Sequence, residues 1–191
     1  MDEIKVEGSI TESRVVKEGG QVVHHESEQG GDGILATHQC CGNLFKTGFS
    51  AGRTIELRQF EFCRVKLKLV VRVPKDVGRD DTEKAVDNFT LEMLAREEAA
   101  VSGRQYEVNI TDETKEILSK CICRCVELQY GLTLKSATKK FESHQVDIIR
   151  ELPVSDNVDL IESFESLSTS MADRLNSHHE RIKGIGSDTG M

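Results

Sequence analysis

Basic and apolar residues alternate between positions 63 and 73, and this alternation is the strongest chemical signal in the sequence. The odd-numbered residues from Cys63 to Val73 are apolar, whereas four of the five even-numbered residues are Lys or Arg. Successive side chains of a strand point to opposite faces, so the pattern predicts a strand with one apolar and one cationic face. Basic side chains at alternate positions lie about 7 Å apart, close to the phosphate spacing of a single nucleic-acid strand. The predicted polyanion-binding residues are Arg58, Arg64, Lys66, Lys68 and Arg72.

Aromatic residues bear on the same hypothesis. Sheet faces that bind single strands usually add aromatic rings on which bases stack, and here only Phe60 and Phe62 are near enough in sequence to serve. The alternative is a solvated outer face, or one whose cations pair with acidic residues of the fold itself.

A second cluster combines histidine and cysteine near the predicted ends of N-terminal strands. Structural zinc sites need four nitrogen or sulfur ligands. The residues that could supply them are His24, His38, Cys40 and Cys41. Adjacent cysteines do not match the Cys-x-x-Cys spacing of common zinc sites. We therefore predict no bound metal and no cofactor, and a metal- or thiol-dependent enzyme is kept only as an alternative function.

Cysteine recurs again at Cys121, Cys123 and Cys125. The spacing of the apolar residues here predicts a helix, capped by Thr111 or the residue after it, that ends before Gly131. Buried cysteine behaves as a small apolar residue, so core packing is predicted for this group. The sequence has no phosphate-binding glycine loop, nucleophile elbow or His-Glu-x-x-His motif, which favours a binding protein over an enzyme.

The chain has 191 residues and a net charge of -8, but the charge is unevenly spread. Residues 51–75 hold seven Lys or Arg against two Glu, whereas residues 76–103 hold three basic residues against eight acidic ones. The N-terminus lacks the apolar run of a signal peptide, and no apolar stretch is long enough to span a bilayer. With six cysteines taken as free thiols, these features predict a cytoplasmic protein that does not associate with membranes.

The N-terminal part is predicted to be rich in β-structure. The Gly19-Gly20 pair supplies the positive φ angles of a tight hairpin turn between strands at 14–17 and 21–24. Residues 26–33 are polar and glycine-rich, which predicts a loop, and residues 47–53 indicate a linker.

A long β stretch at 54–73 and a helix at 82–102 follow. The apolar positions of the β stretch change face within it, so a bulge or turn near Gln59–Glu61 is predicted. The helix is expected to pack its apolar stripe on the odd-numbered face of the strand.

The second half is predicted to be mainly helical. A short strand at 106–110 precedes the helix that contains the cysteines, and residues 132–152 fit either a strand or a helix. One long helix is predicted from 156 to 183, with a flexible tail at 184–191. Its apolar stripe is close to a heptad repeat, so the helix either forms a coiled coil between chains or docks on its own domain. We favour self-association into a homo-oligomer through Leu160, Phe164, Leu167, Met171, Leu175, His178 and Ile182.

The block ELRQFEFCRVKLKLVVRVPKDVGRDDTEKAVDNFTLEMLAREEAA, which is residues 56–100, resembles a pattern found in small, uncharacterised phage-type proteins. The matching features are Phe60-Glu61, the alternating strand from Val65 to Pro74, the acidic Asp80-Asp81 loop and the helix that contains Glu97-Glu98-Ala99. The resemblance implies a strand-then-helix unit and a mobile-element setting, and it supplies no catalytic residue. The N-terminal β section and the C-terminal helix depart from it.

Together these patterns predict an α+β protein. Its expected parts are an antiparallel β-rich domain at 1–103 with its packing helix at 82–102, an α-rich part at 104–153, and a long amphipathic helix at 156–183. We predict a non-enzymatic binding or assembly protein that holds single-stranded nucleic acid on its cationic strand. The alternative is a protein-interaction adaptor or regulator that docks an acidic partner and self-associates.

Overall fold

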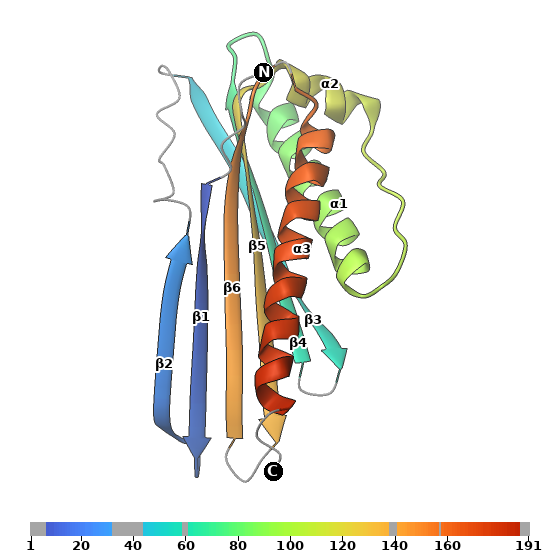
Figure 1. Cartoon of the computed structure of the whole chain (residues 1–191). Coiled ribbons are helices and arrows are strands. Elements are labelled where there is room, and N and C mark those ends of the chain that lie inside the picture. Colours follow the sequence, from blue (N-terminus) through green and yellow to red (C-terminus); the bar gives the residue numbers. More distant parts are fainter. Residues whose placement is uncertain (1–6, 32–43, 59–60, 138–140, 157, 188–191) are drawn as a thin grey trace.

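One antiparallel sheet organises the chain (Figure 1). The computed structural model describes residues 7–31, 44–58, 61–137, 141–156 and 158–187. The six strands lie in the order β2-β1-β6-β5-β4-β3. Their bounds are β1 (Glu7–Glu18), β2 (Gln21–Gly31), β3 (Phe45–Arg58), β4 (Glu61–Val73), β5 (Ile122–Ala137) and β6 (Phe141–Val154). The three helices are α1 (Arg79–Val101), α2 (Asp112–Lys120) and α3 (Leu160–Ser187). The α+β class and the antiparallel sheet are as predicted.

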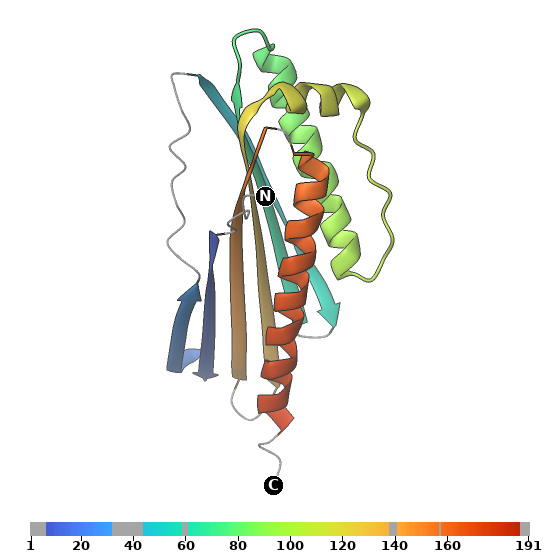
Figure 2. The same cartoon turned by 45° about the horizontal axis from the view of Figure 1, so that its top comes forward.

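The order of the strands joins the two halves of the sequence. The chain forms three hairpins, β1–β2, β3–β4 and β5–β6, and the third hairpin fits between the first two. Helices α1 and α3 lie side by side on one face of the sheet, and α2 lies across its upper end (Figures 1 and 2). The predicted β-rich domain at 1–103 is therefore not a separate unit, because β5 and β6 form the middle of the same sheet.

The core lies between the sheet and these helices. All the odd-numbered residues of β4 from Cys63 to Val73 are at most 2% exposed, as the alternation predicts. Helix α1 contributes Phe89 and Met93, and α3 contributes Phe164, whose ring meets that of Phe89 edge-on with centroids 6.4 Å apart. The predicted packing of the 82–102 helix on the odd-numbered face of β4 is confirmed.

The prediction of an α-rich part at 104–153 is wrong. Thr111 caps α2 by accepting a hydrogen bond from the backbone N–H of Thr114 at 3.2 Å, but α2 ends at Lys120 and two long strands follow. Near the cysteines, the apolar residues have the spacing expected of a helix over two turns. The alternation that begins at Val126 is the stronger signal, since every second residue from there is buried, namely Val126, Leu128, Tyr130 and Leu132.

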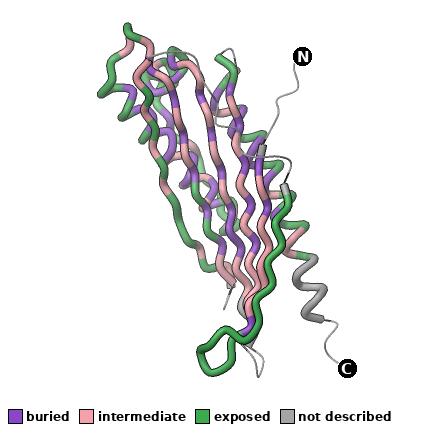
Figure 3. Tube along the Cα trace, turned by 90° about the vertical axis from the view of Figure 1, so that its left-hand side faces the viewer, coloured by how far each residue is buried: buried purple, intermediate pink, exposed green. Residues whose placement is uncertain are grey.

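The predicted loop at 26–33 is also wrong for residues 26–31, which belong to β2 and pair with β1. All residues from 21 to 30 are exposed, as the side view of the sheet shows (Figure 3). An edge strand needs backbone pairing but no apolar side chains, so its polar composition gives no strand signal. Residues 32 and 33 lie outside the described residues.

Two further expectations fail for identifiable reasons. Residues 47–53 lie inside β3, where a Cβ atom at Gly48 would meet the Leu69 carbonyl oxygen at 2.9 Å, so glycine permits the close approach of β4. Residues 106–110 form no strand. Instead, the Tyr106 hydroxyl and the Asn109 N–H both donate to the carboxylate of Glu92 on α1, at 3.1 and 2.9 Å.

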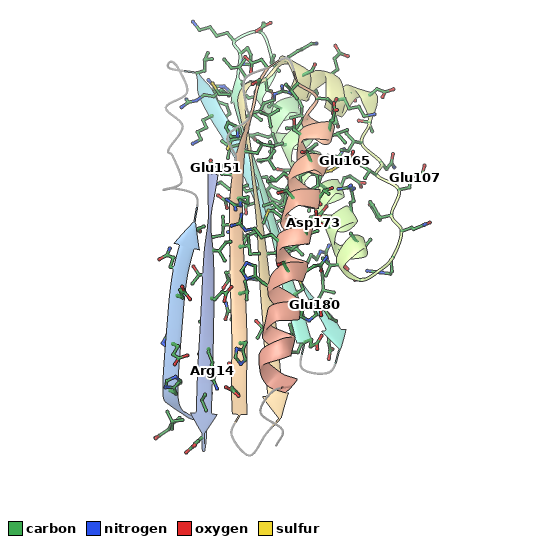
Figure 4. All side chains as sticks on the ribbon, viewed as in Figure 1. Arg14, Glu107, Glu151, Glu165, Asp173 and Glu180 are labelled. Atoms are coloured by element: carbon green, nitrogen blue, oxygen red, sulfur yellow. The ribbon has the colours of Figure 1, made fainter. Side chains whose placement is uncertain are left out.

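The C-terminal helix docks on the chain's own sheet. Five residues of its predicted stripe, Leu160, Phe164, Leu167, Met171 and Leu175, are at most 9% exposed and belong to the core. His178 contacts Glu12 of β1, and the side chain of Ile182 lies outside the described part. The opposite side of the helix carries Glu165, Asp173 and Glu180, which are exposed (Figure 4).

A buried carboxylate connects both helices to the sheet. Glu97 of α1 is 1% exposed and accepts hydrogen bonds from the Tyr130 hydroxyl of β5 and from Ser168 Oγ of α3, the latter at 2.8 and 2.9 Å. Arg96 Nη1 lies 3.0 Å from the same carboxylate. Burial and the negative charge of Glu97 raise the pKa of Tyr130 well above its usual range. Each polar partner is thus satisfied inside an otherwise apolar layer.

Replacing Glu97 by alanine tests this connection. The change leaves the Tyr130 and Ser168 hydroxyls buried without their acceptor, so we expect Glu97→Ala to lower the free energy of unfolding by about 3 kcal/mol or more. The neighbouring Glu98 forms exposed pairs with Arg53 and Arg104, so Glu98→Ala should cost less than about 1 kcal/mol. Chemical denaturation measures both values, and equal losses would contradict a structural role for the Glu97 cluster.

Candidate interface on the open face of the sheet

The even-numbered residues of β4 lie on the face opposite to α1 and α3. No helix among the described residues covers this open face, and its side chains are polar or charged at most positions. The register places Lys46 of β3 opposite Arg72 and extends the row of basic residues onto the edge strand. We call this row the cationic stripe; it consists of Lys46, Arg64, Lys66, Lys68 and Arg72.

The next two strands carry carboxylates on the same open face. Register places Glu127 of β5 opposite Lys68, and Glu151 of β6 opposite Glu127. Asp147 of β6 lies in the row that contains Arg64. We call these residues, Glu127, Asp147 and Glu151, the acidic stripe. The open face therefore presents two parallel stripes of opposite charge, and Glu56 of β3, opposite Phe62, adds a carboxylate on the cationic side.

Two ion pairs join the stripes. Lys68 Nζ lies 3.4 Å from Glu127 Oε2, and Arg64 Nη2 lies 3.0 Å from Asp147 Oδ1. The second pair spans the intervening strand β5 at Gly131, where a Cβ atom would lie 2.6 Å from the Asp147 carboxylate. The absence of a side chain at Gly131 is what allows the pair to form. Both pairs are partly exposed, so each contributes less than about 1 kcal/mol to stability.

The other predicted polyanion-binding residues lie in different settings. Arg72 donates a hydrogen bond to the Leu44 carbonyl at 2.9 Å, whereas Lys66 is exposed. Arg58 is in β3, but its side chain, like Gln59 and Phe60, lies outside the described part. Phe62 has the parity of the open face and is half-buried. The structure thus places four of the five predicted residues on one face. Lys46 lies on the same face but was not predicted, because a linker at 47–53 implies no strand at this position.

Of the predicted histidine and cysteine cluster, only His24 lies among the described residues. His24 lies on β2 with its Nε2 atom 2.8 Å from Glu26, while His38, Cys40 and Cys41 lie outside the described residues. Within the part of the chain that the structure describes, no group of three or more His, Cys, Asp or Glu side chains is arranged to hold a metal ion.

A further group of titratable residues, which includes His178 of the predicted stripe, lies between the C-terminal half of α3 and the sheet. His178 contacts Glu12, and His179 Nε2 lies 3.8 Å from Glu61. His144 of β6 lies 3.8 Å from Glu142, and burial lowers its pKa. These polar contacts replace the apolar core at this end, so the helix stripe ends its apolar packing near Leu175.

Of the four described cysteines, Cys63 and Cys121 belong to the core, whereas Cys123 and Cys125 are half-buried. Cys63 is fully buried, and this burial raises its pKa to about 12. Burial also raises the pKa of Cys121 and Cys125, and the Cys125 thiol donates to the Glu151 carboxylate at 2.9 Å. A thiol with a raised pKa is a poor nucleophile at neutral pH, so none of these three suits a thiol-dependent enzyme.

Among the described residues, no helix has the length and apolar character needed to cross a membrane. In comparisons with protein-family models, curated proteins and solved structures, no family, relative or structural neighbour matches this chain. The resemblance of residues 56–100 to phage-type proteins therefore stays a prediction.

Alkylation kinetics test the burial of Cys63. Because a pKa near 12 leaves very little thiolate at pH 8, we expect Cys63 in the folded protein to react with iodoacetamide on the order of a thousandfold more slowly than an ordinary cysteine. Peptide mass spectrometry measures the rate at each site, and the protein unfolded in guanidinium is the control. Equal rates at Cys63 in the folded and unfolded states would contradict its position beneath α1.

Proposed function

We propose that this chain is a non-enzymatic assembly protein that binds a second copy of itself through the open face of the sheet. The observation that supports the proposal is the separation of cations and carboxylates into two parallel stripes on a face that no described helix covers. The predicted interaction function with self-association is thus retained, but it is assigned to the sheet and not to the apolar stripe of α3, which is used within the chain.

The two stripes complement each other under twofold symmetry. Most homo-oligomers are closed, and a twofold interface brings the same patch of both subunits together. If the axis passes between the stripes, the cationic stripe of one copy faces the acidic stripe of the other. Each copy then supplies the cations of one row of ion pairs and the carboxylates of the other row. This pairing fixes the register of the two sheets.

A nucleic-acid strand fits this surface less well. The carboxylates of Asp147 and Glu127 lie within 3.0 and 3.4 Å of Arg64 and Lys68, so they already compensate two of the predicted phosphate-binding cations. A phosphate placed on either cation would also meet the neighbouring carboxylate. In addition, Phe62 is the single aromatic residue described on β4, whereas single-strand binding gains from several stacked rings.

Charge-swap variants provide the test. We expect wild-type protein to sediment as a dimer at low ionic strength. Lys66→Glu/Lys68→Glu should weaken the dimer at least about tenfold, and so should Glu127→Lys/Glu151→Lys, because each places like charges opposite each other. An equimolar mixture of the two variants should recover the dimer, since the reversed stripes are again complementary. Sedimentation velocity measures all four samples.

The control is Lys84→Glu/Lys120→Glu, which changes the charge by the same amount on exposed residues of α1 and α2. It should leave the dimer unchanged. A monomeric wild type, or a mixture of variants that does not recover the dimer, would refute the proposal. Fluorescence anisotropy with a labelled single-stranded oligonucleotide completes the test. A monomeric wild type whose binding to the oligonucleotide is lost in Lys66→Glu/Lys68→Glu would favour the nucleic-acid function instead.

A further inference from the structure

The helices α1 and α2 and the starts of β5 and α3 meet at the upper end of the molecule (Figure 2). Residues of these elements line a pocket of about 270 Å³. It is on the helical side of the sheet and does not involve the open face, so the inference drawn from it is independent of the proposed assembly. Most of its wall is apolar and consists of Phe89, Ile110, Leu118, Val158, Leu160 and Ile161.

A buried guanidinium forms the polar part of this wall. Arg124 is 3% exposed, and its Nη2 atom donates to the carbonyl oxygens of Ser155 and Val158. Its Nε atom is buried and has no hydrogen-bond partner among the described residues. No carboxylate in the described part of the chain lies within 4.0 Å of the Arg124 guanidinium. The described cations that do form ion pairs are all more exposed than Arg124, for example Arg53, Arg64 and Arg96.

Regular alternation in β5 places Arg124 on the core side, in phase with the buried Val126 and Leu128. The register between β4 and β5 shifts between Val70 and Arg72, and Cys123 has a φ of 48°, in the left-handed region. A bulge of this kind changes the direction of the side chains beside it. The irregularity therefore affects the residues before Arg124, whereas Arg124 faces the core and the next residue, Cys125, contacts Glu151 on the open face.

A buried cation without a carboxylate at ion-pair distance is expensive. Burial lowers the pKa of Arg124, and the charges of Asp156 and Asp159 offset only part of that effect. Breaking a buried ion pair typically costs about 3–5 kcal/mol, because one charge is then left without a partner. An anion bound in the pocket would supply the missing charge.

The other charged groups restrict the kind of anion. Lys115 of α2 lines the pocket and adds a second cation, which also pairs with Asp112 at 3.6 Å, whereas Asp156 and Asp159 line it with negative charge. Asp159 is already engaged, because its Oδ1 atom accepts from the backbone N–H groups of Ile161 and Glu162 at 2.8 and 2.9 Å. These carboxylates disfavour a dianion such as phosphate, so a single negative charge fits the pocket better.

We propose that this pocket binds a small monocarboxylate with an apolar body. The carboxylate group lies toward Arg124 and Lys115, and the apolar body packs on the wall formed by Phe89 and Leu118. A pocket of about 270 Å³ has room for a medium-length alkyl chain or for one aromatic ring. A ligand here contacts α2 and the start of α3 together, so it stabilises the junction between β6 and α3.

Two octane derivatives separate the role of charge from that of apolar contact. By isothermal titration calorimetry with wild-type protein, we expect octanoate to bind with a Kd of about 1 mM or lower. The neutral 1-octanol should bind at least about tenfold more weakly, because it cannot compensate the guanidinium. Absence of octanoate binding, or equal affinity for octanoate and 1-octanol, would overturn the proposal.

Variants locate the site. Arg124→Gln should weaken octanoate at least about tenfold, whereas Arg104→Gln, which removes an exposed arginine outside the pocket, should leave the affinity unchanged. Arg124 also donates to the carbonyl oxygens of Ser155 and Val158, so a second variant guards against misfolding. Ile161→Phe fills the pocket from a half-buried position and should abolish octanoate binding while circular dichroism retains the wild-type spectrum. Unchanged affinity in Ile161→Phe, or in a folded Arg124→Gln, would place the ligand elsewhere and refute the assignment.

Discussion

The structure depends on the burial of alternate residues along β4. Because β4 lies inside the sheet and its odd-numbered residues face α1 and α3, each of them must be apolar, and the structure leaves them at most 2% exposed. Side chains of a strand alternate between faces, so the even-numbered residues must point to the open face. A slip of one residue would bury Arg64, Lys66 and Lys68 in the core. The position of the β4 cations on the open face is thus a direct consequence of the packing on the other side.

Two buried charged residues of this chain illustrate the difference between a structural and a binding role. Glu97 is surrounded by donors from α1, β5 and α3, and a satisfied group of this kind fixes how the layers pack. Arg124 is as deeply buried, yet its donors reach only two backbone carbonyls and it lacks a carboxylate partner among the described residues. Its position beside an apolar pocket explains why a ligand, and not another part of the fold, is the partner that we infer.

Strong local patterns were sufficient to predict the centre of the fold. The alternation in β4, the helix after it and the Gly19-Gly20 turn are set by periodicity and turn chemistry, and the structure contains each of them. The strand predicted at 21–24 left out the rest of β2, since an edge strand needs few apolar residues. The first part of β5 was predicted as helix because the residues near Cys121 have a helical spacing, and residues 132–152 were left open between strand and helix. The acidic stripe was unpredictable because it depends on strand order, a long-range property. Likewise, the contact of Ser168 with Glu97 joins residues 71 positions apart in the sequence, and no local pattern predicts it.

The two proposed sites lie on opposite faces of the sheet but share neighbouring residues of β5. Arg124 faces the pocket, and Cys125 contacts Glu151 of the acidic stripe. Coupling between the sites would need an element with two alternative arrangements whose equilibrium both ligands shift. The middle strands β4, β5 and β6 are paired along their lengths and pack on the core, so they provide no such element. Self-association through the open face leaves the pocket uncovered. We therefore infer that assembly and ligand binding act independently in this protein.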